Sequence, residues 1–467
     1  MLIQQLYTGC LSEAAYYIEN NGEAAIIDPL RDIEEYIHLA TEHNARIRYI
    51  FETHFHADFV SGHLDLHKAT GAPIVYGPGT ETNFPIHLAA DGEIFKLGSV
   101  SIEVIHTPGH TLESSCYLLR DENGKPYALF TGDTLFVGDV GRPDLSSGNM
   151  KKEELAEIMY DSLKKITALP DDVLVYPAHG AGSSCGKNLG PETASTIGEQ
   201  KLTNYALQPQ SKEEFIKSVT KDLDAPPNYF PINARINKEG YDSLDEILKK
   251  GLTPMKVEEF KKRMNDDDVT VLDTRRASTF INGFIPGSVS IGLEGRFAEW
   301  AGVILSFEKP ILLVADKGLE KETVIRLARV GFSRIEGYLE GGFEAWQASA
   351  EKIDLIIEVD PDELAMDIPF DKNLVIVDVR RETEFGDGHI TNALNIPLDE
   401  LTDPLNMANF EDKHNIYIHC GTGYRSVIAA SLFKKHGLHN IRNVTGGFEK
   451  IRELDRISIS RENSVLN

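Results

Sequence analysis

An internal repeat in the C-terminal half constrains the fold of this chain more than any other feature of the sequence. Three blocks recur in the same order, and each copy lies 105 residues after its partner (378 − 273, 388 − 283 and 447 − 342). Matched blocks at one domain-sized offset predict two homologous domains rather than a solenoid of short repeats. The pairs are VLDTRR (271–276) with IVDVRR (376–381), GFIPGSVSI (283–291) with GHITNALNI (388–396), and GGFEAW (341–346) with GGFEKI (446–451).

The second copy of the repeat contains a cysteine loop between a predicted strand and a predicted helix. The apolar strand 415–419 is expected to run into Cys420, and a helix is expected to follow and to end near Gly437. Backbone N–H groups of a glycine-rich loop at a helix N-terminus stabilise negative charge, and Arg425 adds a cation. Cys420 is therefore predicted to be a catalytic thiolate assisted by Arg425. The loop residues expected to bind the substrate are Gly421, Thr422, Gly423, Tyr424 and Ser426.

The cysteine loop and the repeated DxR and GGF blocks resemble those of rhodaneses, over about residues 250–467. Arg425 is the fifth residue after Cys420, which gives a Cys-x4-Arg spacing. Cys-based phosphatases use the longer Cys-x5-Arg spacing, which makes room for phosphate. The shorter loop favours sulfane-sulfur transfer, and a degenerate binding module is the other alternative.

The first copy of the repeat lacks the cysteine nucleophile. Its predicted strand 310–315 leads into Asp316 where the repeat would place the nucleophile. Glu320 and Glu322 follow in the same loop and would repel a persulfide or thiosulfate anion. The first copy is therefore predicted to be an inactive rhodanese-like domain that serves as a spacer or an interface.

Histidines and aspartates in the N-terminal half follow apolar, strand-like runs. A hairpin is predicted around Asn20-Asn21-Gly22, a helix over about 32–44, and a strand over 47–52. The alternation of predicted strands and helices continues to about residue 180 and predicts an α/β domain whose ligands lie in loops beyond strand ends. Four such segments favour a shared metal site over four unrelated structural histidines. The segments are THFHAD (53–58), TPGH (107–110), TGD (131–133) and YPAH (176–179).

This set of segments resembles the metallo-β-lactamase superfamily, over about residues 1–208. Dinuclear hydrolases of that superfamily carry a histidine directly after the motif aspartate, where it binds a second metal. Phe59 occupies that position here and cannot bind a metal. A second ion would be left with Asp58, Asp133 and His179, which is a weak set. We therefore expect a mononuclear site.

The longer string HFHADFVSGH, with GRPD at 141–144 and HGAGSSCG at 179–186, is similar to persulfide dioxygenases. The resemblance implies one Fe(II) per chain, held by His54, His110 and Asp133, in the two-histidine, one-carboxylate pattern of non-haem oxygenases. Three further residues would then orient the ligands and tune the iron. They are His56, Asp58 and His179.

A zinc site remains the alternative to iron. His54, His56 and His110 could together hold Zn²⁺, and a zinc-bound hydroxide would make a glyoxalase II-like thioester hydrolase. Arg142 is a candidate for binding a substrate carboxylate, because its guanidinium is a planar bidentate donor, and Tyr176 is a weaker candidate for the same pocket. Ordinary structural roles remain open for both residues.

The chain contains four scattered cysteines and no CxxC pair, so a reducing compartment is expected. Cys185, in a Gly/Ser-rich loop after His179, is a candidate reactive thiol or an inert loop residue, and Cys10 and Cys116 are expected to pack. The N-terminus resembles no signal peptide, and no apolar stretch is long enough to cross a membrane, so a cytoplasmic protein is expected. The net charge of −26 disfavours nucleic acid as a partner.

A chain of 467 residues exceeds what one hydrophobic core usually supports. The expected fold is an α/β multidomain chain: a metallo-β-lactamase αββα sandwich followed by two rhodanese-like α/β domains. The expected domains are 1–250 (dioxygenase with its linker), 251–352 (inactive rhodanese-like) and 353–467 (active rhodanese). Within the first domain, segment 205–240 is Pro- and Asn-rich and is predicted to be an extended connection.

Together, the resemblances imply a bifunctional sulfur-oxidising enzyme. Fe(II) and O2 would oxidise a low-molecular-weight persulfide, of glutathione, coenzyme A or a similar thiol, to sulfite and thiol. Cys420 would transfer sulfane sulfur to sulfite and produce thiosulfate, which would detoxify sulfide. Family analogy also suggests a homo-oligomer, and neither a nucleic acid nor a membrane is expected as a partner.

Overall fold

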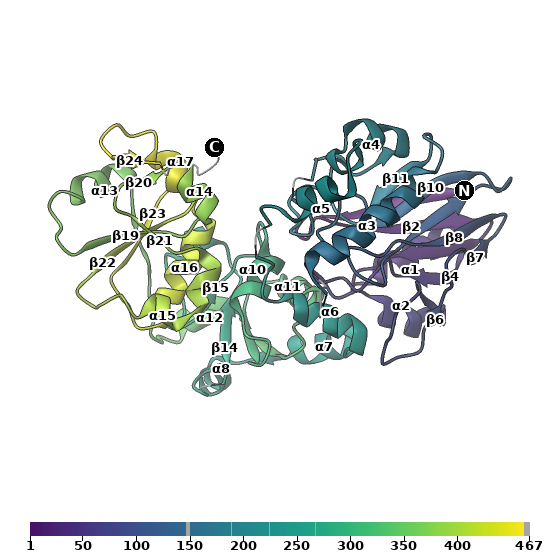
Figure 1. The fold of residues 1–467 in the computed structure, drawn as a ribbon. Helices are drawn as coiled ribbons and strands as arrows, with labels where there is room; N and C mark the ends of the chain where they lie inside the picture. The colour runs from purple at the N-terminus through teal and green to yellow at the C-terminus, as the bar shows by residue number, and fades with distance from the viewer. Residues whose placement is uncertain (146–149, 188, 224, 267, 462–467) are drawn as a thin grey trace. The chain divides into compact units, whose positions relative to one another are not determined.

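The structure is a computed structural model that describes residues 1–145, 150–187, 189–223, 225–266 and 268–461 (Figure 1). Its internal contacts divide the chain into two compact units: residues 1–247 with 325–333, and residues 248–324 with 334–467. The expected α/β multidomain fold is confirmed. The recurring sequence blocks of both copies lie in the second unit, although residues 325–333 of the first copy belong to the first unit. The boundaries expected near residues 250 and 352 remain predictions.

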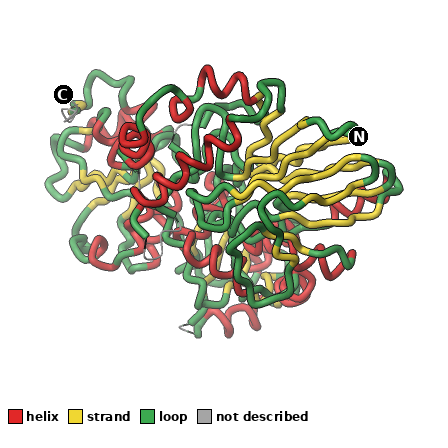
Figure 2. Tube along the Cα trace, turned by 45° about the vertical axis from the view of Figure 1, so that its right-hand side comes forward, coloured by secondary structure: helices red, strands yellow, loops and turns green. Residues whose placement is uncertain are grey.

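The first unit contains two six-stranded sheets whose long strands are seen in Figure 2. The first sheet has the order β1-β2-β3-β4-β5-β6 and the second has the order β12-β11-β10-β9-β8-β7. The predicted hairpin is present, because Asn21 and Gly22 both adopt positive φ (53° and 77°) between β2 and β3. The strands are β1 Leu2–Thr8, β2 Glu13–Asn20, β3 Glu23–Ile27, β4 Arg46–Phe51, β5 Ile74–Tyr76, β6 His87–Leu88, β7 Ile94–Leu97, β8 Val100–His106, β9 Ser115–Arg120, β10 Pro126–Gly132, β11 Leu174–Pro177 and β12 Ser195–Thr196.

Helices cover the outer faces of both sheets, which completes an αββα sandwich. Side chains alternate along β2, so Tyr16 packs into the core between the sheets and Tyr17 into the core beneath α1 and α2. On the second sheet, Leu118 and Leu129 pack with residues of α3, α4 and α5. The helices are α1 Glu34–Glu42, α2 His63–Thr70, α3 Lys152–Thr167, α4 Ile197–Thr203 and α5 Lys212–Thr220.

Segment 205–240 is largely helical, so the expectation of an extended connection is wrong. It forms a 3-10 turn at Tyr205–Leu207, then α5 and α6 (Phe230–Glu239), and α7 (Leu244–Gly251) follows. Ser211 starts α5 through a capping box with Glu214. The proline-rich stretch marks the start of α6, because a proline in the first helical turn loses no intrahelical hydrogen bond.

The second unit contains two parallel five-stranded sheets with the same strand arrangement, β13-β17-β16-β14-β15 and β18-β23-β22-β19-β21. The sequence repeat is thus a repeat of whole domains. A separate two-stranded sheet pairs β20 with β24. The strands are β13 Pro254–Met255, β14 Thr270–Asp273, β15 Val289–Ser290, β16 Ile311–Val314, β17 Ile335–Leu339, β18 Ile357–Val359, β19 Leu374–Asp378, β20 His389–Ile390, β21 Leu394–Asn395, β22 Asn415–His419, β23 Ile441–Val444 and β24 Ile459–Ser460.

Short helices connect these strands. Among the described residues, each helix is either too short or too polar to cross a lipid bilayer. The helices are α8 Val257–Met264, α9 Ala277–Phe280, α10 Phe297–Ile304, α11 Glu320–Arg329, α12 Gly342–Ala348, α13 Pro361–Asp367, α14 Glu382–Gly386, α15 Pro404–Met407, α16 Tyr424–Lys435 and α17 Gly447–Ile451, with a 3-10 helix at Leu398–Thr402.

A buried arginine stabilises each copy in the same way, and we call it the arginine brace. In the first copy, Arg275 forms a bidentate ion pair with Asp273 at the end of β14 and donates to the carbonyl of Gly283 at 2.9 Å. Its guanidinium also lies 4.1 Å from the ring centre of Phe343. These contacts explain why the DxR and GGF blocks recur together. The brace of the second copy consists of Arg380, Asp378, Gly388 and Phe448.

Candidate functional site

The metal-site residues predicted from the sequence come together at one end of the sandwich. His54 follows β4, His110 lies between β8 and β9, and Asp133 follows β10 directly. All three side chains are buried, and their donor atoms lie within 4.8 Å of one another. The strand-and-loop pattern therefore places two imidazoles and one carboxylate around a common point.

Hydrogen bonds fix the orientation of both imidazoles. Thr53 Oγ1 donates to Asp28 Oδ2 at 2.8 Å, so it can only accept from His54 Nδ1 at 3.0 Å. His110 Nδ1 donates to the carbonyl of Arg142 at 2.9 Å. With Nδ1 protonated in both rings, the bare Nε2 atoms are the ones left to bind a metal.

These Nε2 atoms face Asp133. His54 Nε2 lies 3.7 Å and His110 Nε2 lies 3.4 Å from the same oxygen, Asp133 Oδ2. Neither carboxylate oxygen of Asp133 has a hydrogen-bond partner among the described residues. Burial, followed by the neighbouring histidines His56 and His110, holds the pKa of His54 well below its ordinary value, so this ring is neutral. Bare nitrogen lone pairs around a buried carboxylate are repulsive unless a cation lies between them, and these residues therefore fit a metal ion.

The three residues expected to orient the ligands form a second group of donors, also within 4.8 Å of one another. His179 Nδ1 donates to the carbonyl of Ser12 at 3.0 Å, and its Nε2 lies 3.6 Å from Asp58 Oδ2 and 3.5 Å from Asp133 Oδ1. Burial lowers the pKa of His179, but these two carboxylates outweigh it and raise that pKa. His56 Nε2 lies 3.1 Å from Asp28 Oδ1.

The position after the motif aspartate contributes no ligand. The ring of Phe59 is buried and packs on His56, with 4.3 Å between the ring centres. The Nε2 atoms of two histidines therefore lie near Oδ2 of Asp133, and the Nε2 atom of one histidine lies near Oδ1.

Sequence reasoning missed two residues that position this site. Asp28, at the end of β3, accepts from both the N–H and the hydroxyl of Thr53 and also contacts His56. Asn237, on α6, donates to the carbonyls of His56 and Phe59. The Asp28-Pro29 pair after an apolar strand is a sequence pattern that could have indicated Asp28. No sequence pattern indicated Asn237, because its segment was predicted to be an extended connection.

Arg142 is buried, and its guanidinium pairs with Asp144 through two contacts of 2.7 Å. Its backbone carbonyl, and not its guanidinium, contacts a candidate metal ligand by accepting from His110. Tyr176 packs in the core, with its ring 5.5 Å from Phe130 and 5.4 Å from Tyr16. The substrate-binding roles of Arg142 and Tyr176 remain predictions.

Cys185 lies beside the metal-site residues, since its Sγ belongs to a donor group with Asp133 and His179. Burial, reinforced by the charges of Asp58 and Asp133, raises the pKa of its thiol well above the ordinary value, so the thiol is protonated. Its carbonyl accepts from the N–H of Arg142 at 3.0 Å. Its reactivity remains a prediction. Cys116 is buried as expected, and burial raises its pKa to about 11, whereas Cys10 is only partly buried.

The second candidate site is the loop that joins β22 to α16. The Sγ atom of Cys420 is buried at the strand end and accepts from the N–H of Gly423 at 3.1 Å, with the hydroxyl of Ser426 at 3.7 Å. The N–H of Gly423 thus donates to the sulfur, while the hydroxyl of Ser426 donates to the carbonyl of Gly423 at 3.0 Å. The guanidinium of Arg425 forms a bidentate ion pair with Glu384, at 2.6 and 2.8 Å. Glu384 thus neutralises much of the positive charge expected beside the sulfur.

The equivalent loop of the first copy follows β16. Val314 pairs with Asp273 as His419 pairs with Asp378, so Ala315 occupies the position of Cys420, and the expectation that Asp316 does so is wrong by one residue. The N–H of Gly318 donates to Glu320 at 2.8 Å, so an acidic side chain closes this loop. The absence of a cysteine from it leaves Cys420 as the candidate nucleophile of the repeat.

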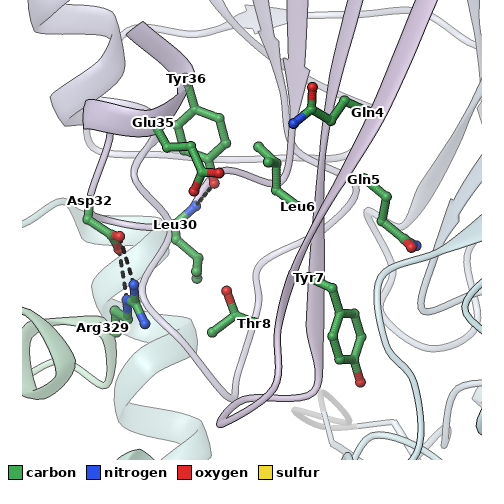
Figure 3. A pocket seen from close by; sticks show the side chains of 10 residues that line it. All are labelled: Gln4, Gln5, Leu6, Tyr7, Thr8, Leu30, Asp32, Glu35, Tyr36 and Arg329. Atoms are coloured by element: carbon green, nitrogen blue, oxygen red, sulfur yellow. Dashed lines mark hydrogen bonds and ion pairs between the residues drawn. The ribbon is translucent and has the colours of Figure 1, made fainter. Parts of the chain in front are cut away.

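A separate polar pocket of about 310 Å³ lies beside β1 (Figure 3). Its opposite charges are already paired, because Arg329 contacts Asp32 through two hydrogen bonds of 2.7 Å. None of the residues proposed above lines it, so it is not part of either site. Its lining residues are Gln4, Gln5, Leu6, Tyr7, Thr8, Leu30, Asp32, Glu35, Tyr36 and Arg329.

Comparisons with known proteins identify both kinds of domain. A model described as "Metallo-beta-lactamase superfamily" matches residues 8–179, and one described as "Rhodanese-like domain" matches residues 256–349 and 360–454. The chain is 32% identical to Glyoxylase B2 of Dictyostelium discoideum over 247 residues, which cover 47% of this chain and 78% of that protein.

Two solved structures are also similar. A metallo-beta-lactamase from Staphylococcus aureus subsp. aureus COL is 34% identical with a TM-score of 0.64, and the match covers 73% of this chain and 98% of that one. ETHE1 from Myxococcus xanthus is 29% identical with a TM-score of 0.43, covering 51% of this chain and 100% of that one. The domain types and their order agree with those expected from the sequence.

Proposed function

Because the chain belongs to the metallo-beta-lactamase superfamily and carries two rhodanese-like domains, we propose that it is a bifunctional sulfur-oxidising enzyme. The first reaction converts a low-molecular-weight persulfide, O2 and water into thiol, sulfite and two protons. The second transfers the sulfane sulfur of another persulfide to sulfite and gives thiol and thiosulfate. Both reactions consume persulfide, so the pair detoxifies sulfide.

The first activity rests on the relation of His54 and His110 to one oxygen of Asp133. Two imidazoles and one carboxylate suit Fe(II) in non-haem oxygenases, and we propose one Fe(II) per chain. A ferrous ion held there supplies the oxygen activation that the reaction requires. The protein orients the ligands through Thr53 and the Arg142 carbonyl and excludes bulk water by burying the site.

The second activity rests on Cys420. The thiolate attacks the outer sulfur of the persulfide, a new S–S bond forms, and the thiolate of the small molecule leaves. The N–H of Gly423 donates to the sulfur and stabilises its anionic form. Sulfite then attacks the terminal sulfur, thiosulfate leaves, and the Cys420 thiolate is regenerated.

A zinc-dependent thioester hydrolase with a rhodanese appendage is the second candidate. The observation in its favour is that His179 faces the other oxygen of Asp133, with Asp58 beside it, as a second metal ion would require. Against it stands Phe59, which removes one ligand from that set.

Anaerobic purification, metal analysis and oxygen uptake with several persulfides test the two functions. We expect one equivalent of iron per chain and oxygen consumption with glutathione persulfide or coenzyme A persulfide. Zinc bound at full occupancy, with no oxygen consumed and with thioester hydrolysis, would replace the first function by the second. Comparing the persulfides identifies the thiol part of the substrate.

The four cysteines are all unpaired, and we propose a reducing, cytoplasmic location for the chain. We also propose that it forms a homo-oligomer. Light scattering coupled to size-exclusion chromatography measures the mass of the particle, and a monomeric mass would contradict that proposal.

A further inference from the structure

The end of α11 contacts the loop of residues 54–62, which begins with the candidate ligand His54 and which we call the histidine loop. Arg329 is the last residue of α11, and its carbonyl accepts from the N–H of Val60 at 2.7 Å. The last carbonyls of a helix have no partner inside the helix, and a buried N–H such as that of Val60 needs an acceptor. Although the repeat places residues 325–333 in its first copy, they belong to the first compact unit.

Val60 lies between residues that support the candidate metal site. The ring of Phe59 packs on His56, and Asn237 donates to the carbonyls of both residues. On the other side of Val60, the N–H of Ser61 donates to the side-chain oxygen of Asn237 at 2.9 Å. The backbone of the histidine loop is therefore held at three consecutive residues, by α6 at Phe59 and Ser61 and by the end of α11 at Val60.

The side chain of Arg329 contacts a second segment that supports the same site. Its guanidinium pairs with Asp32 through two hydrogen bonds of 2.7 Å (Figure 3). Asp32 lies four residues after Asp28, which accepts from the N–H and the hydroxyl of Thr53 and also contacts His56. Arg329 thus joins the histidine loop to the segment that orients its histidines.

The pair of Arg329 with Asp32 is largely shielded from solvent, since the two side chains are 15% and 28% exposed. Charges at this level of burial are screened less by salt than charges on the open surface. A guanidinium that binds both oxygens of a carboxylate also fixes the relative orientation of the two groups. The pair therefore fixes the last turn of α11, and with it the carbonyl that accepts from Val60.

We propose that Arg329 is a positioning residue of the candidate metal site and that residues 325–333 complete the metal-binding unit. Arg329 acts on the ligands through the histidine loop and through Asp32. The first copy of the repeat, which lacks the cysteine nucleophile, thereby supplies a segment on which the other candidate site depends. This role rests on the proposed metal site, whichever ion the site holds.

Anaerobic binding of Co²⁺ to the full chain tests this role. Arg329→Gln should raise the dissociation constant for Co²⁺ by about 3- to 10-fold, below or at the lower end of the effect of residues that contact a ligand directly. Hydrogen–deuterium exchange of the metal-free chain should be faster by about the same factor in the peptide that contains Val60. Peptides from β19 and β22, in the second unit, should exchange as in the wild type.

Two further variants test whether the ion pair is the cause. Asp32→Asn should weaken Co²⁺ binding as much as Arg329→Gln does, and the double variant should bind no more weakly than the weaker single variant, because all three lose the same pair. Arg329→Lys keeps the charge but offers no planar fork, so its affinity should lie between those of the wild type and Arg329→Gln.

Arg120→Gln is the matched control. Arg120 pairs with Glu103 and is 25% exposed, and it ends β9, whose first residue, Ser115, is the one that donates to the carbonyl of Thr53. This variant therefore loses a similar ion pair of the first unit at the strand end away from the histidine loop. Its Co²⁺ affinity and the exchange of the Val60 peptide should match those of the wild type.

A wild-type chain that binds neither Fe(II) nor Co²⁺ would contradict the proposed metal site itself. A metal-binding wild type with unchanged Co²⁺ affinity in Arg329→Gln and Asp32→Asn would overturn the role of Arg329 alone. Additive losses in the double variant would also overturn it, because the two residues would then act independently. Faster exchange in β19 and β22 would overturn it as well, since the effect would not be local to the histidine loop.

Discussion

Thr53 lies between His54 and Asp28, accepting from the imidazole at 3.0 Å and donating to the carboxylate at 2.8 Å. Because this chain of hydrogen bonds fixes which nitrogen of His54 is protonated, Thr53→Val should weaken metal binding by about 10- to 100-fold. Anaerobic titration with Fe(II) or Co²⁺ measures the change. Thr53→Ser keeps the hydroxyl and should bind metal as the wild type does, whereas equal affinities in all three proteins would contradict this role.

Asp133 is predicted to bind the metal ion together with the histidines of the site. Asp133→Ala should lose bound metal and oxygen consumption while thiosulfate:cyanide sulfur transfer remains within about twofold of wild type. Metal content per chain, oxygen uptake and sulfur transfer on one preparation check the prediction. Retention of full metal content in this variant would exclude Asp133 as a ligand.

Cys420→Ser should give the opposite pattern. The hydroxyl is a poor nucleophile toward sulfane sulfur, so sulfur transfer should fall below detection and sulfite should accumulate as the end product of persulfide oxidation. Chromatographic quantification of sulfite and thiosulfate measures the ratio. If folded Cys420→Ser and Asp133→Ala each lost both activities, the proposed division of labour would be wrong.

His63 should make the first unit sensitive to acid. Burial, assisted by the charge of Arg31, lowers the pKa of His63 to about 3 from an ordinary 6.5. Between these values the unfolded chain binds a proton that the folded chain does not, so stability falls as the pH drops from 6.5 toward 3. The limiting slope is about 1.4 kcal/mol per pH unit.

Urea unfolding of the metal-free protein between pH 7.5 and 5 measures this slope. The imidazole stacks on Phe84, with 5.1 Å between the ring centres, so His63→Gln also loses packing and should be less stable at pH 7.5. The informative quantity is the slope. His63→Gln should lose stability less steeply than wild type on acidification, and parallel curves would show that another group titrates.

The repeat and the histidine motifs predicted the fold closely, because both express physical requirements that are local in sequence. The alternation around Tyr16 and Tyr17 encodes a strand with two buried faces, and the 105-residue offset encodes two domains with one strand order. Segment 205–240 was mispredicted because its prolines are typical of loops as well as of helix starts. The sequence alone does not distinguish these two uses.

The candidate metal site was predictable as a set of residues but not as a hydrogen-bond network. The fold brings Asp28 and Asn237 to His56 from β3 and from α6, and no spacing in the sequence encodes that meeting. Ion pairs that neutralise an arginine were not predictable for the same reason. Asp144 pairs with Arg142 and Glu384 pairs with Arg425, so each guanidinium has less net charge around it than the sequence suggested.

The arginine brace occurs in both copies of the repeat, whereas the cysteine occurs only in the second. Its partners lie at a strand end and in segments other than the loop that carries or lacks the nucleophile. Folding and chemistry in these domains therefore depend on separable residues. A domain of this kind can therefore lack the reactive thiol and still keep its architecture.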